Sequence, residues 1–309
     1  MGSIEARFSH LYLTEEQAFE LDPEQKQQRI TQLLNQSYEI YDYCVQHLVR
    51  DDGRELKATL LLFSGGNDST FLFHLFKTVA DYAVHINTTI GIEQTREFVR
   101  DTCRNNDVDL IEALPPDGNT YRDLILDMGF PGPNAHHLMY QRLKERCLDT
   151  VRKQFITNKH RHRVIYLSGR RRSESHRRAV APFFDKDGSA VWCAPILNWT
   201  KSDINTYKKL YGGIPVNPVT ELIHMSGECL CGAFATAGEW EQLKMFFPET
   251  AEVIHQLEHD VAENADVADY RKQWGWGQYP QNHHRARAKR PQDRKIGPLC
   301  SSCEHKPLP

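Results

Sequence analysis

The stretch LLLFSGGNDSTFLFHLF, from Leu60 to Phe76, decides the fold. Its first four residues are all apolar, which is typical of a strand covered on both faces of a sheet. After a polar break, apolar residues return at helical spacing. These residues are Phe71, Leu72, Leu75, Phe76, Val79 and Ala80. The sequence therefore predicts a strand, a tight glycine turn and a helix.

The turn between this strand and this helix predicts a seat for an anion. Gly65 and Gly66 can adopt positive φ and let a ligand come close to the backbone. The following helix directs its positive end and its free N–H groups at the turn, which favours a phosphate. A P-loop is excluded because no Lys stands before Ser69, and the Gly-x-Gly-x-x-Gly spacing of dinucleotide sites is absent.

The six residues from Ser64 to Ser69 read Ser-Gly-Gly-Asn-Asp-Ser and closely resemble the PP-loop of the ATP pyrophosphatase superfamily. The alternative is a plain glycine turn between a strand and a helix. The resemblance implies that the ligands are ATP and Mg²⁺, and that Asp68 is a catalytic residue that helps to hold Mg²⁺. The implied nucleotide-binding residues of this loop are Ser64, Gly65, Gly66, Asn67, Ser69 and Thr70.

A second motif, YLSGRRRSESHRR from Tyr166 to Arg178, follows another apolar strand. Arginines make bidentate contacts with phosphate, although a solvated basic loop is the alternative. The stretch resembles the G-x-R-x-x-E-S-x-x-R element of the phosphoadenosine-phosphosulfate reductase family. The matching residues are Gly169, Arg171, Glu174, Ser175 and Arg178. The resemblance implies that Arg171 and Arg178 neutralise charge on pyrophosphate, while Gly169 and Glu174 help to bind the nucleotide.

A third motif, APILNWTKSDINTY from Ala194 to Tyr207, is similar to that family's P-I-x-x-W-T-x-x-D-I-x-x-Y element. Thr200 is expected to cap a helix whose third position is Asp203, so this element is structural. The resemblance covers the chain from about Thr59 to Cys231 and rests on three motifs in the family's order.

Composition limits the classes of protein that are possible. The 309 residues carry a formal net charge of -3, so no global attraction to nucleic acid follows. No apolar run is long enough to span a membrane, and the first ten residues lack the apolar region of a secretory signal. We therefore expect a cytoplasmic protein without a membrane partner.

Predicted strands and helices alternate along the middle of the chain. The strands are Thr59–Phe63, Ala83–Asn87, Asp109–Glu112, Val164–Ser168 and Val191–Ala194, and the helices include Pro23–Leu48, Ile92–Asn105 and Asn134–Lys159. This alternation predicts an α/β fold, a Rossmann-like parallel sheet with helices on both faces. The family resemblance implies the adenine nucleotide α-hydrolase-like version of that fold.

The predicted domains are a helical N-terminal extension over 1–56, a PP-loop nucleotide-binding domain over 57–215 and a four-cysteine metal-binding C-terminal region over 216–309.

The eight cysteines fall into two groups. Cys44, Cys103, Cys147 and Cys193 occur singly in apolar patterns and are expected to be inert core residues. The others form two pairs, Cys229 with Cys231 and Cys300 with Cys303. Two pairs can supply four thiolates to one centre, either a 4Fe-4S cluster or Zn²⁺. The alternative is that these are unrelated surface thiols.

The sequence lacks one functional element of the reductases. They carry a Glu-Cys-Gly-Ile/Leu-His element with the nucleophilic cysteine, and no such element is present among these 309 residues. The chain looks more like the DndC/SspD-type proteins of DNA phosphorothioation. That resemblance implies an ATP pyrophosphatase that activates a substrate, while a sulfur-donor protein supplies sulfur. The enzyme alternative is a phosphoadenosine-phosphosulfate or other sulfonucleotide reductase, and the non-enzyme alternative is an ATP-binding subunit of a complex.

DNA is a candidate partner, either directly or through a complex. The basic stretch Arg285–Lys295 is a candidate nucleic-acid contact, and a solvated linker is its alternative.

Overall fold

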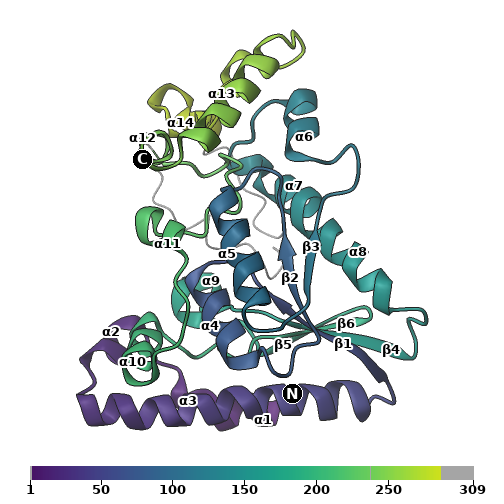
Figure 1. The fold of residues 1–309 in the computed structure, drawn as a ribbon, viewed down its shortest axis with the longest axis vertical. Coiled ribbons are helices and arrows are strands. Elements are labelled where there is room, and N and C mark those ends of the chain that lie inside the picture. Colours follow the sequence, from purple (N-terminus) through teal and green to yellow (C-terminus); the bar gives the residue numbers. More distant parts are fainter. Residues whose placement is uncertain (1, 237, 287–309) are drawn as a thin grey trace.

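The computed structural model describes residues 2–236 and 238–286, and these residues form an α/β fold around a six-stranded sheet (Figure 1). The strands are β1 Glu55–Leu62, β2 Tyr82–Ile86, β3 Leu110–Ala113, β4 His162–Leu167, β5 Phe184–Asp187 and β6 Ala190–Cys193. Their order across the sheet is β3-β2-β1-β4-β6-β5. The strand before the glycine turn therefore lies near the middle of the sheet, between β2 and β4.

The predicted fold class is confirmed, with one correction to the sheet. β1 pairs in parallel with β2 and β4, and β2–β3 and β4–β6 are also parallel. The edge strand β5, which the sequence did not predict, is antiparallel to β6. Its residues are Phe-Asp-Lys-Asp, and only Phe184 is buried, so the strand lacks the apolar pattern that reveals the others.

Helices precede, connect and follow the strands. Before the sheet lie α1 Gly2–Phe8, α2 Glu15–Glu20 and α3 Pro23–Tyr43, and α3 continues into a π-helical turn over Cys44–Arg50. Within and after the sheet lie α4 Asn67–Phe76, α5 Glu93–Arg104, α6 Tyr121–Met128, α7 His136–Tyr140, α8 Arg146–Phe155, α9 His176–Ala179 and α10 Lys201–Tyr211. The remaining described helices are α11 Pro218–Ile223, α12 Glu239–Phe246, α13 Pro248–Ala262 and α14 His283–Ala286.

The sheet is covered on both faces, which explains the uninterrupted apolar run in β1. On one face, helices α3, α4, α5 and α10 share a core with the strands; its members include Leu33, Phe71, Val99, Ile204, Leu61 and Ile165. On the other face, residues of α8 share a core with Leu60, Leu62, Val164 and Trp192. Successive residues of a strand point to opposite faces, so both alternating sets must be apolar.

The helices of the N-terminal extension begin at strong capping signals. Thr14 accepts a hydrogen bond from the Gln17 N–H and forms a capping box at the start of α2. Asp22 forms a second capping box with Gln25, and Pro23 occupies the first helical position of α3. In Figure 1, α3 runs below the sheet and α2 lies beside α10.

A third core lies outside the sheet. It joins residues of α6 and the segment before α5 to α11, α12, α13 and two tryptophans; its members include Ile92, Tyr121, Ile125, Leu243, Ile254, Trp274 and Trp276. Beyond Gly212, no strand occurs in the described residues. No helix in the described part of the chain is long and apolar enough to cross a membrane.

Candidate functional site

The predicted anion seat lies where β1 ends and α4 begins. Ser64, Gly65 and Gly66 follow the strand, and Gly66 is the N-cap of the ten-residue helix α4. Gly65 has a φ of 74°, and a Cβ there would lie 2.8 Å from the Thr95 Cγ2 atom. A side chain at this position would therefore meet both backbone strain and a clash. Glycine is therefore the residue that fits this position of the turn.

Hydroxyl groups of α4 hold this turn against the helix. Ser69 Oγ and Thr70 Oγ1 each donate to the Gly66 carbonyl oxygen, at 2.9 Å. The Ser64 N–H donates to Ser69 Oγ at 3.2 Å, and the two serine hydroxyls lie 3.1 Å apart. These contacts pre-organise the loop, while the side chains of Ser64 and Asn67 remain exposed.

The arginine loop approaches the same turn from the end of β4. A Cβ at Gly169 would lie 3.2 Å from the backbone carbon and oxygen of Asp68 and from the nitrogen of Ser69. Such a contact is tighter than nearly all real Cβ contacts, and the neighbouring atoms are backbone that cannot swing away. Glycine at position 169 therefore permits the two loops to come together.

Arg171 lies between two carboxylates. Its Nε atom is 2.9 Å from Asp68 Oδ1, and its Nη1 atom is 3.0 Å from Glu15 Oε1. Only 3% of the Arg171 side chain is exposed. Burial alone would lower the pKa of Arg171, but the charges of Asp68 and Glu15 outweigh it and raise that pKa, so the guanidinium stays charged. Sequence reasoning placed Asp68 and Arg171 here but missed Glu15.

The other described arginines of this loop also have carboxylate partners. Glu174 forms an ion pair with Arg178, and one of its oxygens accepts the Arg171 N–H at 3.1 Å. Arg170 pairs with Asp185 at 3.1 Å. Arg172 pairs with Glu5 of the N-terminal extension at 2.8 Å. A basic run in the sequence is thus largely neutralised within the chain.

A segment of the C-terminal region, which contains Asn217 and Ser226, also packs against this turn. The Asn217 amide donates to the Gly65 carbonyl oxygen at 2.9 Å and to Thr95 Oγ1 at 3.0 Å. Thr95 Oγ1 in turn donates to the Ser226 carbonyl oxygen, and a Cβ at Gly66 would lie 3.5 Å from Ser226 Cβ. Sequence reasoning missed Asn217 and Ser226 because neither belongs to a motif.

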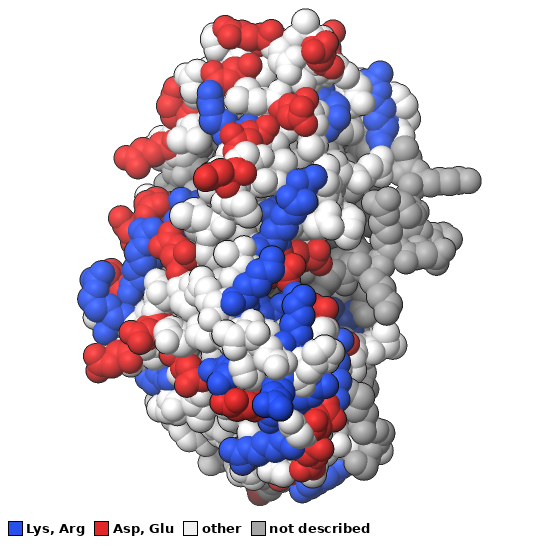
Figure 2. Space-filling view, turned by 90° about the vertical axis from the view of Figure 1, so that its right-hand side faces the viewer, with Lys and Arg blue, Asp and Glu red and all other residues white. Residues whose placement is uncertain are grey.

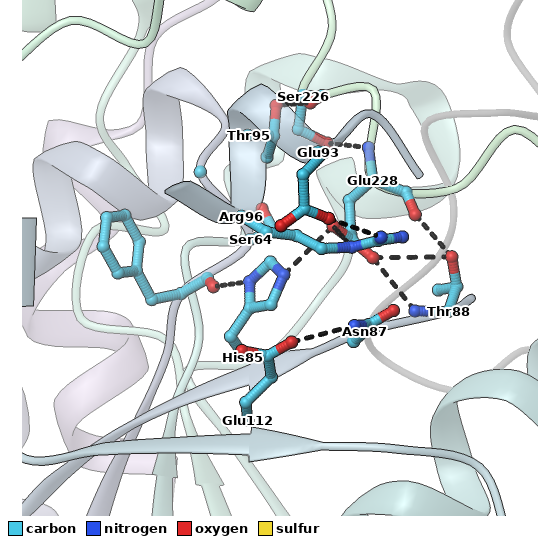
Figure 3. A network of polar contacts seen from close by, with 12 residues as sticks. Ser64, His85, Asn87, Thr88, Glu93, Thr95, Arg96, Glu112, Ser226 and Glu228 are labelled. Atoms are coloured by element: carbon cyan, nitrogen blue, oxygen red, sulfur yellow. Dashed lines mark hydrogen bonds and ion pairs between the residues drawn. The ribbon is translucent and has the colours of Figure 1, made fainter. Parts of the chain in front are cut away.

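A buried network ties this segment to the end of β2 (Figure 3). His85 Nδ1 donates to the Phe63 carbonyl oxygen at 2.8 Å, and His85 Nε2 lies 3.0 Å from Glu228 Oε2. The other Glu228 oxygen accepts the Thr88 N–H at 2.9 Å. Glu228 directly precedes Cys229, so this network holds the first cysteine pair, Cys229 and Cys231, near the carboxyl end of β2.

Only part of the predicted four-thiolate centre is described. Cys231 is buried in the third core, and its carbonyl oxygen accepts the Tyr121 hydroxyl at 2.9 Å. Among the residues that the structure describes, no group of three or more His, Cys, Asp or Glu side chains forms a metal site. Cys300 and Cys303 lie outside those residues, so two of the four predicted ligands are not placed.

The four single cysteines are all buried, as the sequence predicted. Burial raises the pKa of Cys103 and of Cys147 to about 12, and it raises the pKa of Cys193 well above its ordinary value. Thiols in such surroundings are not ionised near neutral pH and are poor nucleophiles.

The basic stretch Arg285–Lys295 is described only at its start. The Arg285 guanidinium lies 4.3 Å from the centre of the Tyr270 ring. Residues 287–295 lie outside the described part of the chain, so this candidate contact stays a prediction.

One family model matches more than half of this chain. The model of the phosphoadenosine phosphosulfate reductase domain matches residues 58–226. A comparison with curated proteins finds no match.

Solved structures that are similar to this chain include two enzymes from Candida species. One is phosphoadenylyl-sulfate reductase of Candida auris, solved as a phosphate complex, with 16% identity over 65% of this chain and 92% of that chain and a TM-score of 0.44. The other is FMN adenylyltransferase of Candida glabrata with FMN and an ATP analogue, with 12% identity over 72% of this chain and 69% of that chain and a TM-score of 0.44.

Proposed function

This chain belongs to the phosphoadenosine phosphosulfate reductase domain family, and on that premise we propose that it is an ATP pyrophosphatase that cleaves ATP to AMP and pyrophosphate. The cleavage would activate a substrate for sulfur transfer. The proposed setting is DNA phosphorothioation, because the sequence most resembles the DndC/SspD-type proteins of that pathway. The family match itself shows a reductase-like nucleotide-binding domain.

The observation that carries the proposal is the phosphate seat between β1 and α4. Gly65 and Gly66 allow a close approach to the backbone, and the N-terminus of α4 offers free N–H groups and a positive end. Gly169 brings the arginine loop against the same turn. These features suit the triphosphate of ATP, with the loop from Ser64 to Thr70 as its main contact.

Asp68 fits a role at Mg²⁺ in this site. Its side chain is 23% exposed, and its Oδ1 atom contacts the Arg171 Nε atom. Mg²⁺ prefers carboxylate and phosphate oxygens and keeps several waters, so one protein carboxylate suffices. When bound, Mg²⁺ would offset the negative charge of the phosphates.

In the proposed reaction, a substrate oxygen attacks the α-phosphorus of ATP and the bond from that phosphorus to the bridging oxygen of pyrophosphate breaks. The products are an adenylated substrate and pyrophosphate, and transfer of sulfur then releases AMP. Arg171 and Arg178 would stabilise the charge that develops on pyrophosphate. Gly169 and Glu174 would shape the loop that presents them.

The cysteines support this proposal over a reductase. A reductase needs an accessible, ionisable thiol, and all four single cysteines are buried. We assign the pairs Cys229–Cys231 and Cys300–Cys303 to one metal centre, a 4Fe-4S cluster or Zn²⁺. Thiolate sulfur suits both, and Cys229 and Cys231 already lie two residues apart on a segment fixed by Glu228.

The proposed partners are a sulfur-donor protein and DNA, the latter directly or through a complex. Figure 2 shows Lys and Arg grouped along the middle of one face, with Asp and Glu gathered at its upper end. With a net charge of -3, the chain as a whole is not attractive to DNA. Association should therefore be salt-sensitive and local. We also propose three domains: a helical N-terminal extension over 1–56, a PP-loop nucleotide-binding domain over 57–215 and a four-cysteine metal-binding C-terminal region over 216–309.

The direct test of the phosphate seat is Asp68→Ala. We expect this variant to lose pyrophosphate release from ATP while it keeps the wild-type melting temperature to within a few degrees, because Asp68 packs little. Asp101→Ala on the exposed face of α5 is the control and should keep full activity. Undiminished pyrophosphate release from Asp68→Ala would exclude the PP-loop assignment.

A further inference from the structure

We propose that Glu15 of the N-terminal extension is a positioning residue that releases Asp68 for Mg²⁺ by holding Arg171. Glu15 lies outside residues 58–226, the part of the chain that the family model matches. The inference rests on the proposed function, because it assumes that Asp68 contacts Mg²⁺ in the nucleotide complex.

Glu15 is held firmly in place by groups other than Arg171. Both of its carboxylate oxygens accept the Lys201 N–H at 2.9 Å, at the first residue of the eleven-residue helix α10. Ser173 Oγ also donates to Glu15 Oε1, at 2.8 Å. A carboxylate at a helix N-terminus is stabilised by the helix dipole. Glu15 is therefore a fixed negative charge beside the arginine loop.

Arg171 shares its charge between this fixed carboxylate and Asp68. The side chain is 3% exposed, with Asp68 at 2.9 Å on Nε and Glu15 at 3.0 Å on Nη1. The two carboxylates differ in freedom. Glu15 is anchored by α10 and Ser173, whereas Asp68 stands in the first turn of α4, at the phosphate seat.

The pairing decides how easily Asp68 can turn toward a cation. A buried guanidinium that loses its sole carboxylate partner is strongly destabilising, because the charge is then unpaired away from water. With Glu15 present, Arg171 stays ion-paired when Asp68 moves. Without the Glu15 charge, Arg171 would hold Asp68 as its remaining carboxylate partner and compete with Mg²⁺ for it.

The chain contains a matched control in Glu5. This residue also belongs to the N-terminal extension and pairs with the arginine loop, through Arg172 at 2.8 Å. It also accepts the Phe183 N–H at 2.7 Å, so it too is anchored by a backbone donor. The Arg172 guanidinium donates to Glu5, Asn198 and the Ala181 carbonyl oxygen and not to Asp68, so Glu5→Gln changes loop docking without changing the competition for Asp68.

The experiment measures Mg²⁺ affinity apart from nucleotide affinity. Calorimetric titration of Mg²⁺ into the full chain saturated with a non-hydrolysable ATP analogue gives the first, and equilibrium dialysis of the analogue without divalent cations gives the second. We expect Glu15→Gln to weaken Mg²⁺ binding about tenfold, within the usual range of coupling between two sites. Analogue binding without Mg²⁺ should not weaken. Glu15→Asp should restore part of the Mg²⁺ affinity, and Glu5→Gln should leave it at the wild-type value.

Two results would overturn the inference. Wild-type Mg²⁺ affinity in Glu15→Gln, together with loss of Mg²⁺ binding in Asp68→Ala, would exclude the role of Glu15 and leave the proposed function standing. Equal losses in Glu15→Gln and Glu5→Gln would show that both residues only dock the loop. Gln at position 15 can still accept the Lys201 and Ser173 hydrogen bonds, so the variant should fold, and thermal melting checks this.

Discussion

Gly169 sets how closely the arginine loop approaches the PP-loop. A Cβ at this position would lie 3.2 Å from backbone atoms of Asp68 and Ser69. We expect Gly169→Ala to push the two loops apart, to destabilise the protein by about 1–3 kcal/mol and to weaken ATP binding. Urea denaturation and equilibrium dialysis measure the two effects.

Gly238→Ala is the control for that change, because a Cβ there would have no atom within 4 Å. It should leave both stability and ATP binding close to wild type. If Gly169→Ala binds ATP as tightly as the control, the close approach of the loops has no part in nucleotide binding.

A second prediction about a single residue concerns Glu15 and the stability of the protein in acid. Burial alone would raise the pKa of Glu15, but hydrogen bonds from Lys201 and Ser173 and the charge of Arg171 hold it below its ordinary value of 4.5. A carboxyl whose pKa is lowered on folding stabilises the protein above 4.5, and this contribution disappears as pH falls through the lowered value. The free energy of unfolding should therefore fall more steeply below pH 4.5 in wild type than in Glu15→Gln. Parallel acid profiles would contradict this reading.

Among the elements, α3 and α10 are joined by a buried ion pair. Arg29 contacts both oxygens of Asp203 at 2.8 and 3.1 Å, and the side chains are 6% and 2% exposed. Arg29→Ala would leave Asp203 buried without its counter-charge, so we expect a loss of about 3–5 kcal/mol in the free energy of unfolding.

The exposed pair of Arg104 and Asp101 provides the comparison, with 73% and 58% of the two side chains exposed. Arg104→Ala should change stability by less than about 1 kcal/mol. Similar losses in both variants, measured by urea denaturation, would show that α3 is not held to α10 by this pair.

The secondary-structure elements also show which parts of the fold can be predicted from the sequence. β1 and α4 were predictable because the apolar period changes at the glycine turn. β5 was missed because it is a polar edge strand. The short helix α6 was missed because a few apolar residues among polar ones do not reveal a period.

The candidate site was predictable where it rests on motifs and not where it rests on tertiary contacts. Asp68, Gly169, Arg171 and Glu174 are local features of two loops, and parallel strands bring their ends to one edge. Glu15 is 156 residues from Arg171 along the chain, and His85 is 143 from Glu228. A single sequence contains no signal for such pairs.

For the whole molecule, we predict that the metal content and the stability of the C-terminal region depend on one another. If Cys229, Cys231, Cys300 and Cys303 share one centre, Cys231→Ala and Cys300→Ala should each lose metal and lower the melting temperature of the C-terminal region. Iron, sulfide and zinc analysis of anaerobically purified protein, followed by thermal melting, measures both. Cys103→Ala should retain its metal. Full metal content in both Cys231→Ala and Cys300→Ala would show that the pairs do not form one site.

The central claim is that the site cleaves ATP and does not reduce a sulfonucleotide. Product analysis on the purified full chain tests it most directly. One reaction contains ATP and Mg²⁺, with water attacking the α-phosphorus in place of the substrate oxygen, and another contains phosphoadenosine phosphosulfate with a dithiol. We predict AMP and pyrophosphate in equal amounts from the first and no sulfite from the second. Sulfite production that depends on a single cysteine would contradict the claim in favour of a reductase, and saturable ATP binding without products would contradict it in favour of a non-catalytic subunit.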